Sequence, residues 1–258
     1  MFQVSQSYID ELVSVVEYRH IFGMVFDENG PLSMEREMAI FHKVEDCLRV
    51  RYPLFRLKII SCALKILGID HMKGQIKFLE QANSDVGQDK MIVGIDAVCE
   101  EDYNTPVDAF LDELYAAKAK FGERLQVVLH AGESNSRNNT EVYDAILLNS
   151  KRIGHGFALA KHPKLIQLVK EKNICIEACP VSNRVLGYTH DLRCHPTRGL
   201  LQQGVKVSIS SDDHGFWNSQ GVTFDYLMAY LAWDLDFSDL RQLAINSLEY
   251  ACVTDEEK

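Results

Sequence analysis

The sequence contains no long apolar run. Its 258 residues hold no stretch of about 18 consecutive apolar side chains, the length that a bilayer-spanning helix requires. The first residues, MFQVSQSYIDELVS, also lack the basic and apolar regions of a signal peptide. We therefore expect no association with a membrane, and this stretch indicates no secretion signal.

Basic residues are scarce relative to acidic ones. The chain has 27 Lys and Arg against 37 Asp and Glu, which gives a formal net charge of −10. Nucleic acid phosphates and anionic membranes attract clustered positive charge, so this balance argues against both as partners. A small-molecule substrate fits the composition better.

Linkers, low-complexity segments and internal repeats are also absent. A hydrophobic content of 47% in 258 residues is sufficient for one large core, so we expect residues 1–258 to form a single domain. The seven cysteines are an odd number, and several stand in apolar runs where cysteine packs as a small hydrophobic residue. We expect them to be mostly free thiols.

Short apolar, β-branched segments alternate with amphipathic segments along the whole chain, which is typical of βα units. Each apolar segment is nearly continuous, as in a strand that is covered on both faces. The predicted strands are Val13–Arg19, Leu57–Ala63, Met91–Ala97, Leu125–His130, Arg152–His155, Ile174–Cys179 and Val205–Ser210.

Residues suited to helix ends stand between these strands. Ser, Thr and Asp are favoured at helix starts, proline in the first turn and glycine just past the end. The predicted starts are at Thr105 with Pro106 and Asp108, at Pro163, and at Ser238 before a last helix over Asp239–Tyr250, and the predicted ends are at Gly122 and Gly204.

Seven parallel strands are one fewer than a closed (β/α)8 barrel has, and a doubly wound open sheet is the alternative that tolerates an odd number. Polar residues at the carboxyl ends of the strands decide between the two, because these ends meet at one face of a barrel, where barrel enzymes carry their active sites. We therefore predict an α/β fold, a (β/α)8 TIM barrel that lacks one strand. The polar residues are Glu17, Asp96, His130, Glu133, His155, Glu177, Asp212 and Asp213.

The segment L-H-A-G-E at 129–133 follows one predicted strand. It brings together the imidazole of His130, a common zinc ligand in its neutral form, and the carboxylate of Glu133, which can act as an acid or base beside the metal. A strand-end histidine that is bonded to a loop carbonyl is the structural alternative.

Two further strand ends carry similar groups. His155 stands between two glycines in R-I-G-H-G at 152–156, where the backbone can approach a ligand closely, although a simple turn histidine is the alternative. In S-S-D-D at 210–213 one carboxylate can bind metal while the other bonds a substrate, or the pair can cap a helix. Each of these purely structural alternatives is reasonable by itself. All three together, at three strand ends of one barrel, are improbable, so the residues favour a common functional site.

Cys175 and Cys179 stand on one predicted strand, four positions apart. A zinc-binding cysteine pair usually brackets a turn, so we expect both to pack in the core. The zinc deaminases of the cytidine type carry H-x-E with P-C-x-x-C, and neither pattern is present here.

Taken in order, L-H-A-G-E (129–133), R-I-G-H-G-F-A-L (152–159), E-A-C-P-V-S-N (177–183) and S-S-D-D (210–213) resemble the adenosine deaminase family. The longer stretches are similar to its secreted branch, adenosine deaminase 2 and the adenosine-deaminase-related growth factors. The resemblance implies a zinc-dependent barrel of the metal-dependent hydrolase type. It also implies hydrolytic deamination of adenosine, and of 2′-deoxyadenosine, to inosine and ammonia.

The resemblance also implies roles for individual residues. His130 and Asp212 would be zinc ligands, and zinc would lower the pKa of a bound water toward ~7 for attack on C6 of the purine. Glu133 would deliver a proton to N1, His155 would orient the water and help to deprotonate it, and Asp213 would bond N7.

Three more positions are assigned to substrate binding by the resemblance. Glu17 matches a position that contacts the ribose in the secreted branch, although a salt bridge to Arg19 is an alternative. Asp96 and Cys99 belong to D-A-V-C at 96–99, where the family has a glycine at the last position that offers its backbone N–H to the purine. Cys99 can do the same only with a glycine-like backbone.

The family carries two further zinc ligands in a His-x-His motif on its first barrel strand, and this sequence has no His-x-His. We therefore expect an amino-terminally truncated chain that holds barrel strands 2–8 and has weak or no activity by itself. The resemblance further implies that the full-length parent is secreted and forms a homodimer, with a cytoplasmic location as the alternative.

Two other functions remain open. One is a deaminase-like protein that no longer catalyses and instead binds nucleosides or a receptor, which the missing motif favours. The other is a different barrel hydrolase, such as an AMP deaminase or a hydrolase of cyclic amides, against which the extended motif matches argue.

Overall fold

The computed structural model describes residues 1–219 and 221–258. In these residues seven parallel strands pair in the order β1-β4-β5-β6-β7-β8-β9, so that each strand lies beside the next one along the chain. The chain divides into two compact units, one of Met1–Cys99, Ala109–Val127 and Ala251–Lys258, the other of Glu100–Asp108 and Val128–Tyr250. Strand β6 passes from the first unit into the second.

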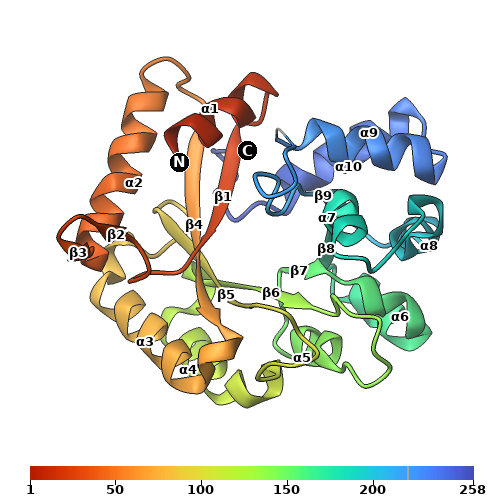
Figure 1. Cartoon of the computed structure of the whole chain (residues 1–258), viewed down its shortest axis with the longest axis horizontal. Coiled ribbons are helices and arrows are strands. Elements are labelled where there is room, and N and C mark those ends of the chain that lie inside the picture. The colour runs from red at the N-terminus through yellow and green to blue at the C-terminus, as the bar shows by residue number, and fades with distance from the viewer. Residues whose placement is uncertain (220) are drawn as a thin grey trace. The chain divides into compact units, whose positions relative to one another are not determined.

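The first unit contains one half of the strand series with its helices (Figure 1). Its parallel strands are β1 (Val15–His20), β4 (Arg56–Leu64), β5 (Ile92–Val98) and the first two residues of β6 (Gln126–Ala131). Its helices are α1 (Phe2–Asp10), α2 (Met34–Arg49), α3 (Gly68–Gln81) and α4 (Leu111–Phe121).

Strand β4 shows why continuous apolar runs form strands here. Leu57, Ile59 and Ile60 have no exposed surface although adjacent side chains point to opposite faces of a sheet. Both faces of β4 are therefore covered, and the strand has no solvent side to which a polar residue could be assigned. The nearly continuous apolar pattern in the sequence, interrupted by the buried Lys58 and Ser61, is the consequence.

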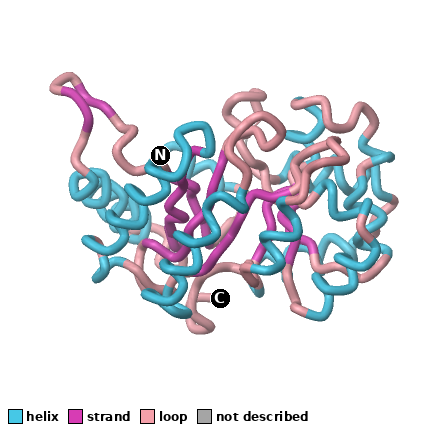
Figure 2. The backbone as a smooth tube through the Cα atoms, turned by 90° about the horizontal axis from the view of Figure 1, so that it is seen from below, coloured by secondary structure: helices cyan, strands magenta, loops and turns pink. Residues whose placement is uncertain are grey.

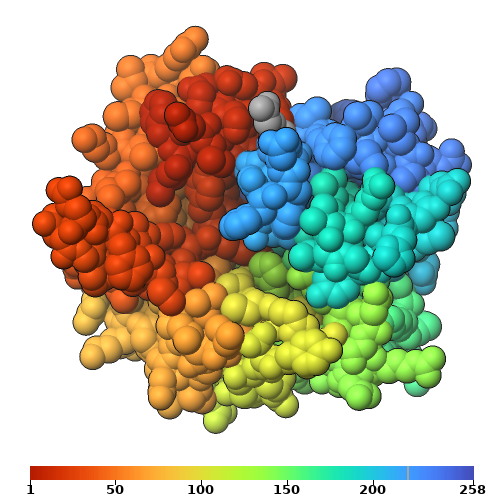
Figure 3. All heavy atoms as spheres, in the orientation of Figure 1, coloured from red at the N-terminus to blue at the C-terminus, as the bar shows by residue number. Residues whose placement is uncertain are grey.

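A small hairpin in the first unit was not predicted from the sequence. Strands β2 (Phe26–Asp27) and β3 (Gly30–Pro31) pair antiparallel just before α2. Figure 2 shows the hairpin as a short pair of strands that stands out at the upper left, and Figure 3 shows it in red-orange at the left edge. The two strands are too short to produce an alternating pattern, so only Asn29-Gly30 in the turn signals them.

The second unit contains the other half of the series. Its parallel strands are the remainder of β6, β7 (Arg152–His155), β8 (Cys175–Ala178) and β9 (Val207–Ile209). Its helices are α5 (Glu141–Leu147), α6 (Pro163–Glu171), α7 (Pro180–Val185), α8 (Pro196–Gln202), α9 (Thr223–Trp233) and α10 (Phe237–Glu249).

All seven predicted strands are confirmed, with ends that differ by at most two residues. The helix ends at Pro163, Gly122 and Gly204 are confirmed too: Pro163 is the first residue of α6. Gly122 and Gly204 adopt the positive φ values of +58° and +78° that favour glycine after a helix. The prediction of one domain over residues 1–258 stays a prediction.

Two predicted helix starts are wrong. Helix α10 is capped by Asp236 and not by Ser238, because the Asp236 carboxylate accepts the N–H groups of Ser238 and Asp239 while the Asp239 carboxylate accepts that of Asp236. At the other site, residues 107–110 form a 3-10 turn before α4, and the N–H of Val107 donates to Glu141 (3.2 Å).

None of the helices in the described part of the chain combines the length and the apolar character needed to cross a bilayer. Among the same residues all seven cysteines are free thiols, in line with the expectation from the sequence.

Candidate active site

The turn after β6 carries L-H-A-G-E and is held by a buried carboxylate. Glu101 accepts hydrogen bonds from the backbone N–H of Gly132 (2.8 Å), from that of Glu133 (3.1 Å) and from Nδ2 of Asn139 (2.7 Å). Gly132 has φ +78°, and a Cβ added to it would lie 2.4 Å from Cγ2 of Val142. The turn therefore requires glycine, and its geometry fixes where Glu133 leaves the backbone.

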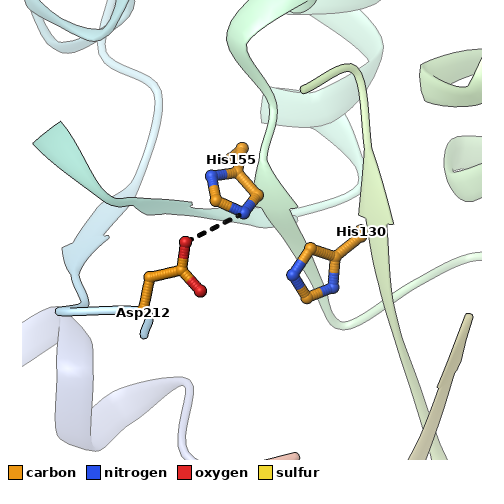
Figure 4. Close-up of side chains that lie close together, drawn as sticks. All are labelled: His130, His155 and Asp212. Atoms are coloured by element: carbon orange, nitrogen blue, oxygen red, sulfur yellow. Dashed lines mark ion pairs between the residues drawn. The ribbon is translucent and has the colours of Figure 1, made fainter. Parts of the chain in front are cut away.

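Three side chains that can bind a metal converge at the ends of β6, β7 and β9. Ligand atoms of His130, His155 and Asp212 all lie within 4.8 Å of one another. Figure 4 shows the two rings and the carboxylate facing a common space, with Nε2 of His155 3.8 Å from Oδ2 of Asp212. Imidazole nitrogen and carboxylate oxygen are ligands that zinc takes in proteins. The family resemblance of the sequence indicated two of these ligands, His130 and Asp212, and the structure places His155 beside them.

The backbone is strained at two of these three residues. His155 has φ +60° and Asp212 has φ +53°, values that residues other than glycine seldom adopt. Such conformations persist only where the surrounding structure fixes them, and they cluster at functional sites. Here they turn the two side chains toward the same space.

Glu133 and His155 share a polar neighbour. Oε1 of Glu133 lies 3.1 Å from Nδ1 of His155, and Nδ2 of Asn183 lies 3.1 Å from the same oxygen and 3.2 Å from the same nitrogen. His155 and Asn183 are buried, with 2% and 0% of their surface exposed. The acid or base predicted at Glu133 is thus tied to the histidine predicted to handle the water proton.

Asp213 follows Asp212 and has a different environment. Although its side chain is accessible, partial burial raises its pKa, and the adjacent charge of Asp212 raises the pKa further, while His130 and His214 oppose this. The two carboxylates of the S-S-D-D segment differ in exposure, since Asp212 is half-buried and Asp213 is exposed.

The other predicted site residues, Glu17, Asp96 and Cys99, lie in the first unit. Glu17 accepts a hydrogen bond from the backbone N–H of Cys252 (2.5 Å), and the fully buried Asp96 accepts one from Nε of Arg19 (2.7 Å). Cys99 has φ +116°, in the region that favours glycine, so its backbone has the shape that the resemblance requires there. Substrate contact by these three stays a prediction.

Cys175 and Cys179 are core residues, as predicted. Both are buried, and burial raises the pKa of Cys175 to about 12 and that of Cys179 well above its usual value, so neither is a ready thiolate for a metal. Glu177, the polar residue at the end of the same strand, forms a buried ion pair with Nε of Arg152 (2.5 Å).

Three residues that the sequence analysis did not single out contact this site. Glu101 holds the L-H-A-G-E turn, Asn183 bonds Glu133 and His155, and His195 lies 3.1 Å from Oδ1 of Asn183 through its Nε2. Asn183 closes the E-A-C-P-V-S-N motif and so had a signal in the sequence. His195 had only its place before Pro196, and Glu101 had none.

Comparison with known proteins decides the family. The family model described as adenosine deaminase matches residues 39–258. The chain belongs to the adenosine deaminase family. It is 36% identical over 258 residues to adenosine deaminase 2 of Dictyostelium discoideum, which covers 95% of this chain and 46% of that protein. It is 35% identical over 257 residues to an adenosine deaminase of Lutzomyia longipalpis, covering 95% of this chain and 49% of that protein. The chain thus spans about half the length of the curated relatives that it matches.

Solved structures support the predicted barrel fold. An N6-methyl-AMP deaminase from Arabidopsis superposes with a TM-score of 0.80 at 19% identity, over 99% of this chain and 73% of that one. An amidohydrolase from Burkholderia ambifaria with bound Zn superposes with a TM-score of 0.84 at 17% identity, over 99% of this chain and 68% of that one. The seven consecutive parallel strands match the TIM barrels of these amidohydrolases, and the doubly wound alternative is excluded.

Proposed function

We propose that this adenosine deaminase family chain carries the catalytic residues for zinc-dependent hydrolytic deamination of adenosine, and of 2′-deoxyadenosine, to inosine and ammonia. The observation that carries the proposal is the meeting of His130, His155 and Asp212 within 4.8 Å, with Glu133 3.1 Å from His155. A possible metal site beside a coupled acid and base is what such a hydrolysis requires.

The donor set fits zinc. We propose that His130 and Asp212 hold the ion, because they offer an imidazole and a carboxylate from the ends of two strands. When bound, zinc supplies a Lewis acid that lowers the pKa of water toward neutrality. The zinc-containing neighbour from Burkholderia ambifaria supports this choice of metal.

The chain's own residues then manage the protons. In the proposed reaction water adds to C6 of the purine after giving one proton to His155, and Glu133 delivers a proton to N1. The amino group then takes up the proton held by His155 and leaves C6 as ammonia, while the hydroxyl proton of the adduct returns to Glu133. His155 orients the attacking water and accepts its proton, and Asp213 bonds N7 of the purine. Glu17, Asp96 and Cys99 are proposed to bind the nucleoside. Secretion and homodimer formation of the full-length protein are proposed on the same resemblance.

The test is an assay of the full-length protein that carries this chain. Loss of the adenosine absorbance should be seen with adenosine and with 2′-deoxyadenosine, and more slowly with AMP. A matched Asp212→Asn variant should lose both activity and zinc. A wild-type protein that holds zinc and deaminates none of the three substrates would contradict the proposal.

A further inference from the structure

His195 is a buried residue of the second unit that the proposed reaction does not use. It precedes Pro196, the first residue of α8, and only 2% of its surface is exposed. Its Nδ1 accepts a hydrogen bond from the backbone N–H of Thr197 (3.3 Å). Because Pro196 has no N–H, Thr197 supplies the first free donor of α8, and His195 caps the helix.

This cap fixes the tautomer of the ring. An Nδ1 that accepts a hydrogen bond carries no hydrogen, so the hydrogen of the neutral ring is on Nε2. Burial, with His155 nearby, lowers the pKa of His195 to about 4, so the ring is neutral at pH 7. Ring contacts with Phe157 and Trp233, at centroid distances of 5.3 Å and 5.2 Å, hold its plane.

The tautomer in turn fixes the amide of Asn183. Nε2 of His195 lies 3.1 Å from Oδ1 of Asn183, so the N–H donates to the amide oxygen. The amide nitrogen then points the other way: it donates to Oε1 of Glu133 (3.1 Å) and lies 3.2 Å from Nδ1 of His155. A flipped amide would bring its oxygen against the Glu133 carboxylate and its N–H against the N–H of His195.

We propose that His195 is a positioning residue for the active site: through the amide of Asn183 it holds Glu133 and His155 in the geometry that proton transfer requires. The proposal rests on the proposed deamination. The hydrogen bonds described for His195 go to Thr197 and Asn183, and it acts on the site through Asn183.

Two substitutions separate positioning from helix capping. His195→Asn keeps a favoured cap for Thr197, but its side chain is too short to reach Asn183. His195→Gln places an amide N–H near the position of Nε2 and restores the donor to Asn183. In the full-length protein we expect His195→Asn to lower kcat about 10-fold to 100-fold with little change in KM, and His195→Gln to recover most of kcat.

A control removes a cap elsewhere. Asp236→Ala deletes the capping box of α10 and should lower the melting temperature while leaving kcat unchanged. If His195→Asn retains the wild-type kcat, or if His195→Gln loses as much kcat as His195→Asn, the positioning role is overturned.

A second measurement does not depend on activity. The ¹⁵N chemical shifts of the His195 ring in the labelled full-length protein should show the neutral Nε2–H tautomer at pH 7. An Nδ1–H tautomer would overturn the hydrogen-bond assignment even in an active enzyme. A wild-type protein with the expected tautomer and no deamination would instead overturn the proposed function and, with it, the catalytic role of His195.

Discussion

Oε1 of Glu133 lies 3.1 Å from Nδ1 of His155. The two groups leave the chain after different strands, β6 and β7, which pair in parallel with Ala131 opposite His155. The register of this strand pair therefore brings the proposed proton donor and the proposed water-orienting group together.

Glu133→Gln removes the proton that is proposed to reach N1. We expect kcat for adenosine to fall by about 10²-fold to 10⁴-fold, the range that a general acid contributes. Zinc content, measured by elemental analysis, should be unchanged because Glu133 is not a proposed ligand. Glu249→Gln, at an exposed position of α10, is the matched control and should keep full activity.

Zinc content distinguishes the roles of the three converging side chains. Asp212→Asn should weaken zinc binding by at least about 10-fold, since it removes a ligand charge. His155→Ala should lower kcat strongly and leave zinc binding within a factor of about 3. A loss of zinc in His155→Ala equal to that in Asp212→Asn would instead make His155 a metal ligand.

Stability should fall in mild acid because of His195. Its pKa is lowered from 6.5 to about 4 by burial and by nearby His155. The unfolded chain therefore binds a proton at higher pH than the folded chain, so stability that is full above about pH 6.5 is lost as the pH falls toward 4. The loss is on the order of 3 kcal/mol. The free energy of unfolding, measured with urea between these pH values, should fall more steeply with decreasing pH in the wild type than in His195→Gln. Parallel curves of this free energy against pH would refute the assignment.

Gly132→Ala should destabilise the protein. The added methyl meets Cγ2 of Val142 at 2.4 Å on a backbone with φ +78°, which together cost about 2–4 kcal/mol. Gly199→Ala in α8 meets no atom within 4 Å and should be neutral or stabilising by about 0.5–1 kcal/mol. Thermal melts of the two variants measure the difference, and equal melting temperatures would contradict it.

Much of the fold was available in the sequence. The seven strands are nearly unbroken apolar runs because each is buried on both faces, and this signal does not depend on what the strand packs against. The ends at Gly122, Pro163 and Gly204 follow from backbone preferences of single residues. The prediction of Ser238 as the cap of α10 was wrong because serine and aspartate are both favoured at a helix start, and the local sequence does not distinguish them. Asp236, two residues earlier, is the cap because it forms a reciprocal pair of hydrogen bonds with Asp239.

The sequence by itself determined the strands, the family motifs and the residue types at the site, since these depend on local chemistry and on order along the chain. Only the tertiary structure decided how they meet. His195 is 40 residues from His155 and 62 from Glu133 in the sequence numbering, yet one buried amide connects all three. Glu101 reaches the L-H-A-G-E turn from 31 residues away. Hydrogen bonds between distant segments leave no periodic trace in a single sequence, because their partners are chosen by how the strands and helices pack.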